Sequence, residues 1–364
     1  MSLALQKFWI KLSNSSLVHS FLKKKLSRAH PPYRFNHLQK LQGINSCLVV
    51  MPGEIRKTLL LWNSFMLLRD LFPQARLLGL SSQESEPFLT PLPTYFDTVY
   101  YLNSETTLFS QHYHQLLNQI QNQAPQVCIL LCDPQELLKY DLALQSRTQI
   151  YIAFQEENAN FPFINLQLKL SSQRPYCQRF TALLKTLRLD PINRPEGVIP
   201  SSHPQQKYSS RNKSNQQIWI GLQWASGLNH FLASRGNLIE LSKRLFEISE
   251  KIGFKIFCPL SEPFSVADWP LQFSSRIIPI KETLPQQLKK ELQTCQILIS
   301  NSSNLFYFAI NLQIPVIGLF SSAESQDWSP DKNLQTRIIV SENSGLFKPE
   351  TIVGIIREIL PDIC

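Results

Sequence analysis

The sequence is poor in glycine and has no long apolar run. Only 11 of its 364 residues are glycine, against 24 prolines, so a fold with many glycine-rich phosphate loops is not expected. No apolar stretch reaches the roughly 18 residues of a membrane-spanning helix. The P-loop, the classical dinucleotide fingerprint and the nucleophile elbow of α/β-hydrolases are all missing. The sequence thus gives no support to these three classes of protein.

Cysteine pairs and metal-ligand clusters are lacking too. The seven cysteines are odd in number and include no Cys-x-x-Cys pair, a usage typical of buried free thiols in a reducing compartment. His112 and His114 have the spacing of ligands on a strand, but no cysteine or acid lies nearby to complete a metal site. We therefore expect no disulfide and no metal ion.

Acidic residues are missing from the first 53 positions. This segment holds eight Lys and Arg residues, and the first acid is Glu54. Removing these eight from the 36 basic residues of the chain leaves 28 against 27 acids. The net charge of +9 therefore belongs almost entirely to an N-terminal arm. A nearly neutral body disfavours nucleic-acid binding, which needs a basic stripe on the folded domain.

Residues 1–30 of the arm alternate apolar clusters with lysines, the densest being Lys23–Lys25. A helix here would be amphipathic and could lie on an anionic membrane surface, where each lysine contributes about 1 kcal/mol. Two other interpretations remain open. The helix could pack on the body with its basic face in solvent, or the arm could be a targeting segment.

Composition divides the rest of the chain in two, as the length also suggests. Residues 189–216 are rich in Pro, Ser, Asn and Gln and nearly free of apolar residues, which predicts an exposed linker. The predicted organisation is a basic amphipathic arm at 1–42, a domain at 43–188, the linker at 189–216 and a second domain at 217–364.

Both predicted domains alternate short apolar strands with amphipathic helices, which is typical of a doubly wound, mostly parallel α/β sheet. Gly253 stands where a helix C-cap belongs. Two such domains bind ligands in the cleft between them, beyond the carboxyl ends of the strands, which singles out the turns at 52–56, 223–231 and 300–304. Strands are predicted at 47–51, 75–80, 98–102, 127–131, 149–154, 218–222, 254–258, 277–280, 297–300 and 316–320, and helices at 57–71, 237–251, 285–294, 304–312 and 350–359.

Three segments carry a family resemblance. Residues 47–80 read as a strand, a Pro-Gly-Glu turn and a helix ending in Phe-Pro, and they are followed by 151–190 and by ILISNSSNLFYFAINLQIPVIGLFSSAESQDWSP at 297–330. In this order they resemble the heptosyltransferase-type glycosyltransferases (glycosyltransferase family 9) over about residues 45–360. The resemblance implies two Rossmann-like domains facing a cleft, the GT-B type. It also implies an inverting, metal-independent transfer of a heptose or hexose from a nucleotide-diphosphate sugar to a lipopolysaccharide-like or other glycolipid acceptor.

The same resemblance assigns roles to particular residues. Glu54 matches the family's carboxylate, which would act as general base toward the acceptor hydroxyl. Donor binding would fall to residues after two strands of the second domain, where a helix N-terminus also attracts phosphate: Gln223, Trp224, Ser226, Ser302, Ser303 and Asn304. Phosphate neutralisation would fall to Arg56, Lys57 and Arg235. Each has a structural alternative, namely a turn carboxylate, a core tryptophan, an N-cap or a solvent-facing charge.

The donor motif has diverged. The family's Asp-Thr-Gly falls on 302–304, its His on Tyr307, and its Lys near Phe231. Two hypotheses therefore remain open. The chain is a glycosyltransferase of the cytoplasmic face of a membrane, anchored by its arm and needing no cofactor beyond the donor, or it is a degenerate homologue that binds or scaffolds at a membrane surface without transferring sugar.

Overall fold

The chain forms two compact units, Met1–Leu187 and Arg188–Cys364. The computed structural model describes residues 16–29, 43–154, 161–168, 176–187, 217–224, 235–259, 269, 271–281, 284–301, 303–330, 335–341 and 348–361. The predicted linker at 189–216 lies outside the described residues, and so do residues 1–15 and 30–42 of the arm. Each unit is described by itself.

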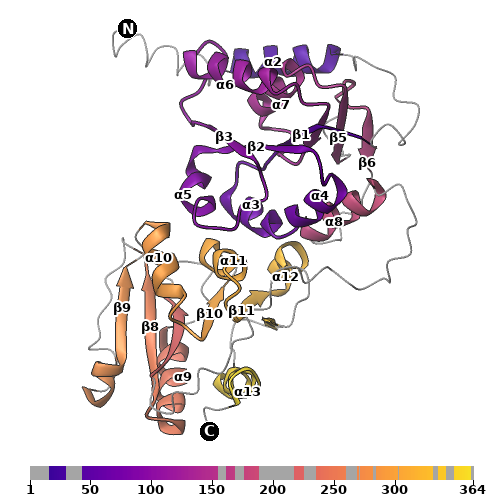
Figure 1. The fold of residues 1–364 in the computed structure, drawn as a ribbon. Coiled ribbons are helices and arrows are strands. Elements are labelled where there is room, and N and C mark those ends of the chain that lie inside the picture. Colours follow the sequence, from indigo (N-terminus) through magenta and orange to yellow (C-terminus); the bar gives the residue numbers. More distant parts are fainter. Residues whose placement is uncertain are drawn as a thin grey trace, which may run out of the picture. The chain divides into compact units, whose positions relative to one another are not determined.

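The first unit is built on a parallel six-stranded sheet with the order β3-β2-β1-β4-β5-β6 (Figure 1). The chain runs outward from β1 to β3 and then crosses back to β4, so the strand order reverses between β1 and β4. Ligands of doubly wound sheets bind at such a reversal. The strands are β1 (Ser46–Val50), β2 (Arg76–Ser82), β3 (Thr98–Leu102), β4 (Val127–Leu130), β5 (Ile150–Phe154) and β6 (Leu166–Leu168).

Helices cover both faces of this sheet. Figure 1 shows α2 (Ser16–Arg28), α6 (Gln111–Asn122) and α7 (Leu137–Gln145) on one face. On the other it shows α3 (Ile55–Trp62), α4 (Phe65–Leu71) and α8 (Tyr176–Leu187). A short 3₁₀ turn, Gln83–Ser85, leads into α5 (Glu86–Leu89).

The predicted helix at 57–71 is in fact the pair α3 and α4. Between them the backbone tightens, because the N–H of Ser64 bonds to the carbonyl of Leu61 and the N–H of Leu67 to that of Ser64. These are three-residue steps of the 3₁₀ kind. They let the rings of Trp62 and Phe65, 5.8 Å apart and edge to face, both reach the core.

The second unit repeats the architecture with the order β12-β11-β10-β7-β8-β9, again all parallel. Its strand order reverses between β7 and β10. The strands are β7 (Ile218–Gln223), β8 (Ile252–Cys258), β9 (Ile277–Lys281), β10 (Ile297–Asn301), β11 (Val316–Ser321) and β12 (Thr336–Ser341). The helices are α9 (Arg235–Ile248), the 3₁₀ helix Leu271–Arg276, α10 (Pro285–Leu292), α11 (Asn304–Asn311), α12 (Ser322–Trp328) and α13 (Pro349–Ile359).

Gly253 corrects one sequence expectation. It does not cap a helix, because α9 ends at Ile248 and Gly253 lies inside β8, opposite Trp219 of β7. A Cβ at this position would come within 2.5 Å of the Trp219 ring. Glycine is therefore required here by the close approach of an aromatic side chain and not by a turn.

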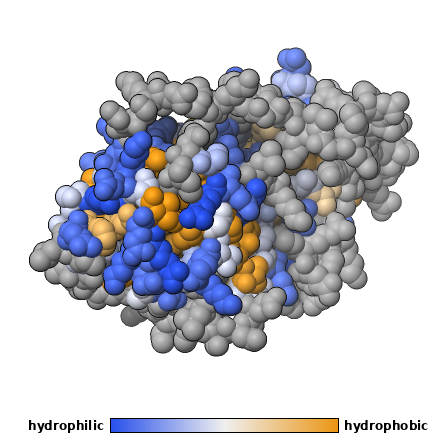
Figure 2. Space-filling model, turned by 90° about the horizontal axis from the view of Figure 1, so that it is seen from below, coloured by the Kyte–Doolittle hydropathy of each residue, from blue (hydrophilic) through white to orange (hydrophobic). Residues whose placement is uncertain are grey.

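One face of the described surface is mostly hydrophilic. Figure 2 shows hydrophilic side chains over most of the described surface of one face, with small hydrophobic areas between them. No helix of the described part is long and apolar enough to cross a membrane. Among the described residues, the exposed large hydrophobic side chains are Phe21, Phe109, Ile278, Leu284 and Val340.

Helix α2, the described part of the arm, packs on the first unit. Leu22 and Leu26 are buried in the core that α7 and the sheet share. Lys25 Nζ lies 2.6 Å from Oδ1 of Asp141, a fully buried carboxylate of α7 that also accepts the hydroxyl of Tyr113. Burial and this carboxylate raise the pKa of Tyr113. Lys23 and Lys24 stay exposed. For Ser16–Arg28 the packed-helix interpretation of the arm agrees with the structure.

We predict that the ion pair between Lys25 of α2 and Asp141 of α7 contributes to the stability of the first unit. Lys25→Met removes the ammonium and leaves the buried carboxylate with the Tyr113 hydroxyl alone. We expect the free energy of unfolding to fall by about 1–3 kcal/mol, measured by urea denaturation. Lys24→Met, on the exposed side of α2, is the matched control. It should change the free energy of unfolding by less than about 0.5 kcal/mol. Equal losses in the two variants would show that the ion pair adds nothing.

Candidate functional site

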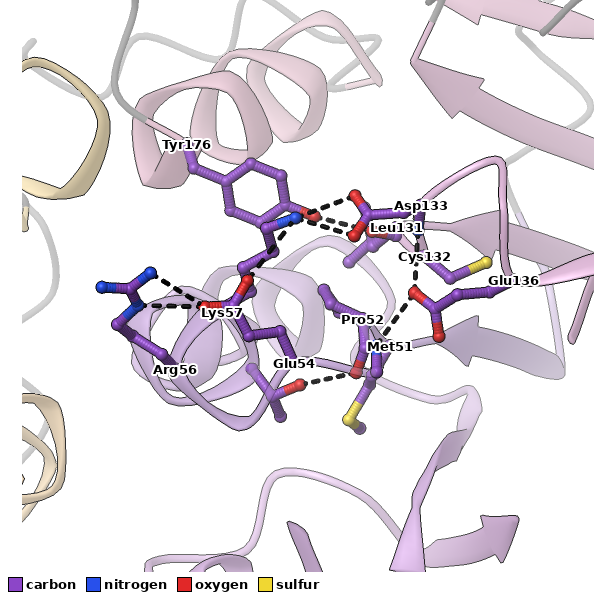
Figure 3. A network of polar contacts seen from close by, with 12 residues as sticks. Met51, Pro52, Glu54, Arg56, Lys57, Leu131, Cys132, Asp133, Glu136 and Tyr176 are labelled. Carbon is purple, nitrogen blue, oxygen red and sulfur yellow. Dashed lines mark hydrogen bonds and ion pairs between the residues drawn. The ribbon is translucent and has the colours of Figure 1, made fainter. Parts of the chain in front are cut away.

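Two loops meet at the strand-order reversal of the first unit. The turn 52–54 follows β1, and residues 131–136 follow β4 (Figure 3). One carboxylate joins them, because Oε1 of Glu136 accepts the N–H of Gly53 at 3.0 Å and that of Asp133 at 2.9 Å. A Cβ at Gly53 would lie 2.5 Å from Oε2 of Glu136. The glycine of the Pro-Gly-Glu turn is thus needed for the approach of this carboxylate.

A nearly buried lysine balances Glu136. Lys139 of α7 places its Nζ 2.8 Å from Oε2 of Glu136 and donates to the carbonyl of Met51, also at 2.8 Å. A buried ammonium is tolerated only when it is paired and hydrogen-bonded. These contacts fix α7 to the end of β1. Cys132 lies beside them and is buried. Burial raises the pKa of its thiol well above the ordinary value, which disfavours the thiolate that a nucleophile requires.

Glu54 occupies the N-cap position before α3, but its side chain makes no capping hydrogen bond. Its carboxylate is 41% exposed, and Oε1 lies 3.0 Å from the guanidinium of Arg56, while Oε2 lies 3.7 Å from Nζ of Lys57. Lys57 makes its shorter contacts with Asp133, at 2.7 and 2.9 Å, and lies 5.7 Å from the ring of Tyr176. Glu54 is therefore a solvent-accessible carboxylate at the end of the central strand. Arg56 and Lys57, two of the three predicted phosphate-binding cations, sit in ion pairs.

The second unit brings two predicted site residues together. Gln223 ends β7 and Ser303 precedes α11, and Oε1 of Gln223 accepts the hydroxyl of Ser303 at 2.8 Å as well as that of Ser300. The Ser303 oxygen also accepts the N–H of Phe306, so it caps α11. Asn304 is the first residue of that helix. This polar cluster lies at the strand-order reversal of the second sheet.

Other predicted residues lie elsewhere. The ring of Trp224 is 6% exposed and packs against Trp269, 5.6 Å between centroids, so it belongs to the core. Tyr307, at the family's histidine position, is buried and donates its hydroxyl to the carbonyl of Trp328 at 2.7 Å. Arg235 is the first residue of α9, and its side chain is not among the described parts. Ser226 and Ser302 lie outside the described residues, as does Phe231.

Sequence reasoning missed Asp133, Glu136 and Lys139. One sequence feature could have indicated them, namely acids that directly follow a buried strand. When that strand neighbours β1, such acids lie at the carboxyl edge of the sheet. The strand at 127–131 was predicted, but its neighbour in the sheet was not. Without that adjacency nothing in the sequence connects Glu136 with Gly53, 83 positions away.

No protein-family model and no curated protein sequence matches this chain. Solved structures do. A glycosyltransferase of family 9 from Veillonella parvula is 13% identical, with a TM-score of 0.64 over 87% of this chain and 97% of that one. The E. coli ADP-heptose lipopolysaccharide heptosyltransferase II is 15% identical, with a TM-score of 0.64 over 87% and 99%. The E. coli heptosyltransferase WaaC, solved with ADP, is 11% identical, with a TM-score of 0.63 over 86% and 99%.

The fold is that of the family 9 glycosyltransferases. The resemblance found in the sequence is confirmed at this level, and so is the predicted pair of doubly wound α/β domains. With identities of 11–15%, the comparison concerns the fold. What the chain does has to be argued from its own residues.

Proposed function

We propose that this protein is a glycosyltransferase that moves a heptose or hexose from a nucleotide-diphosphate sugar to a glycolipid acceptor. The observation that carries the proposal is the match of both units together to heptosyltransferases, one of them solved with ADP. Both units also keep a polar cluster at the strand-order reversal, where this fold class binds ligands.

The donor diphosphate would bind to the second unit at the N-terminus of α11. Free N–H groups and the helix dipole attract anions there. The hydroxyl of Ser303 is held at this end by Gln223. Gln223 and Asn304 offer further amide groups, and Ser226, Ser302 and Arg235 complete the proposed set. Trp224 would support the site from the core and not by stacking on the base.

The acceptor would react at Glu54 of the first unit. Glu54 takes the proton of the acceptor hydroxyl, while the oxygen of that hydroxyl bonds to the anomeric carbon of the sugar. The bond from that carbon to the diphosphate breaks, and the nucleoside diphosphate leaves with the electron pair. Attack opposite the leaving group inverts the configuration. Charge on the leaving group would be neutralised by Arg56, Lys57 and Arg235 in place of a metal ion, so Arg56 and Lys57 would leave their ion pairs.

A second candidate is a homologue that binds nucleotide or glycolipid without transferring sugar. Tyr307 favours it, because a buried phenol bonded to a backbone carbonyl replaces the family's histidine. The ion pairs of Arg56 and Lys57 favour it as well, because both cations already have carboxylate partners.

Nucleotide binding is the first test. Purified full-length protein is heated with a panel of nucleoside diphosphates and nucleotide sugars. A ligand at about 100 times its dissociation constant adds roughly 2.7 kcal/mol of stability, which raises the melting temperature. We expect one nucleotide to do so selectively and Ser303→Ala to abolish that shift. Ser110→Ala removes a comparable N-cap, on α6 of the first unit. This variant should still show the nucleotide-induced shift in melting temperature. A panel without any shift contradicts donor binding.

Loss of the proposed base separates the two candidates. Glu54→Gln keeps the size of the side chain but cannot take a proton, so sugar transfer to lipopolysaccharide-type acceptors should fall about 10²- to 10⁴-fold. The nucleotide-induced melting shift should remain, because Glu54 lies in the other unit. Wild-type protein that binds nucleotide but transfers no sugar would support the non-catalytic candidate. Unchanged transfer in the variant would remove Glu54 from the mechanism.

The outward face of α2 is the proposed contact with an anionic membrane, at whose cytoplasmic side the acceptor would be reached. Lys23, Lys24 and Phe21 are exposed on it. The double variant Lys23→Glu/Lys24→Glu should reduce co-sedimentation with phosphatidylglycerol vesicles, since each lysine contributes about 1 kcal/mol. Lys289→Glu/Lys290→Glu on α10 changes the net charge equally and should not. Similar losses in both double variants would indicate nonspecific attraction.

A further inference from the structure

A cluster of three polar side chains in the second unit joins the ends of two neighbouring strands. It consists of Gln223 at the end of β7, Ser300 in β10 and Ser303 before α11. Ser300 is only 2% exposed, whereas Gln223 is partly exposed. The mechanism above gives Ser300 no role, although its hydroxyl belongs to the cluster at which the donor is proposed to bind.

Two serine hydroxyls hold the oxygen of the Gln223 amide. Oε1 of Gln223 accepts the hydroxyl of Ser300 and, at 2.8 Å, that of Ser303. An amide oxygen has two lone pairs, so both are in use. The Ser300 oxygen also lies 3.1 Å from the carbonyl of Asn301 and 3.3 Å from Oγ of Ser303. Both contacts are longer than the one with Gln223, so the single hydrogen of Ser300 is best used on Gln223.

The hydroxyl of Ser303 has no hydrogen left for a ligand. Its one hydrogen is donated to Gln223, and its oxygen accepts the N–H of Phe306 at 3.3 Å as the cap of α11. A hydroxyl donates only once. Ser303 therefore cannot donate to a phosphate without giving up Gln223.

The nitrogen of the Gln223 amide keeps its donors. Among the residues that the structure describes, Nε2 of Gln223 has no hydrogen-bond partner, whereas Oε1 has two. The amide is planar, so fixing its oxygen also fixes the direction of its two N–H groups. The last torsion of a glutamine is broad and roughly two-fold. Without the two hydroxyls the amide could turn over and present its oxygen in place of its nitrogen.

We propose that Ser300 is a positioning residue of the donor site. Together with Ser303 it holds the amide of Gln223 so that the N–H groups of Nε2 donate to the diphosphate of the donor. The inference rests on the proposed function, in which that diphosphate binds at the N-terminus of α11. It adds a residue that acts only through another, and it assigns the side-chain contact with phosphate to an amide nitrogen. Hydrogen bonds to a charged phosphate oxygen are stronger than those between neutral groups.

The test measures nucleotide affinity by calorimetry on the full chain, with ADP, GDP, UDP and CDP as probes. We expect Ser300→Ala to weaken the tightest of them about three- to tenfold, because Ser303 alone then holds the amide. Ser146→Ala is the matched control. Ser146 is 4% exposed and shares a 2.7 Å hydrogen bond with Thr148 in the first unit. Both variants should lower the melting temperature of the free protein, but Ser146→Ala should leave the affinity unchanged.

Two variants of Gln223 show whether Ser300 acts through it. Gln223→Ala removes the amide and should weaken binding about tenfold or more. The double variant Ser300→Ala/Gln223→Ala should bind like Gln223→Ala alone, because the two residues share one contact with the ligand. Gln223→Glu keeps the shape and can still accept both hydroxyls. Its second oxygen would meet the diphosphate with a negative charge, so it should bind more weakly than Gln223→Ala.

Three results would overturn the positioning role while leaving donor binding intact. They are wild-type affinity in Ser300→Ala, a loss that adds in full in the double variant, or a Gln223→Glu variant that binds as well as Gln223→Ala. The Gln223 variants change a partly exposed residue, so they decide the question even where Ser300→Ala does not fold. Wild-type protein that binds none of the four nucleotides would refute donor binding itself, and the role of Ser300 with it.

Discussion

The carboxylate of Glu136 holds together the carboxyl edge of the first unit's sheet. It binds two backbone N–H groups from loops that follow different strands, and its second oxygen neutralises a buried lysine. These bonds fix the turn that ends in Glu54, the residue proposed to meet the acceptor. A loop that carries a reacting group must hold its position closely, because a displacement of about 1 Å can cost around 10²-fold in rate. The glycine at position 53 follows from the same contact, since a side chain there would strike Glu136.

In the second unit, neutral side chains connect the two strand ends at the strand-order reversal. Gln223 at the end of β7 accepts hydroxyls from Ser300 and Ser303 at the end of β10. In both units a single side-chain oxygen therefore bridges the two strand ends where the order reverses. The charge differs between them, with Glu136 in the first unit and Gln223 in the second. The bridging group at the N-terminus of α11 is itself uncharged, which suits a site proposed for a diphosphate.

Sequence patterns predicted the strands better than the contacts between them. Short apolar runs closed by turn residues located ten of the twelve strands that the structure shows, and the run at 98–102 was placed at its observed bounds. Helix α7 was not predicted, because Lys139 and Asp141 interrupt its apolar pattern. Both residues are nevertheless buried in the structure. Their partners, the Met51 carbonyl and Lys25, are about a hundred positions away. The polar bridge in each unit was hidden for the same reason, since Glu136 and Gln223 bond to residues that only the strand order brings near.

Helix α2 is held in the core of the first unit, and this limits what it can do at a membrane. Its apolar face is used by Leu22 and Leu26, and one of its lysines is held by Asp141. The exposed charges that remain on α2 are those of Lys23, Lys24 and Arg28. At about 1 kcal/mol each, they supply roughly 3 kcal/mol, less than a single acyl chain provides. Helix α2 alone would therefore give weak, reversible attachment, and Lys7 and Lys11 with their apolar neighbours would have to add the rest. Such attachment would let the protein sample a surface that carries glycolipid acceptors and still leave it to exchange donor and product.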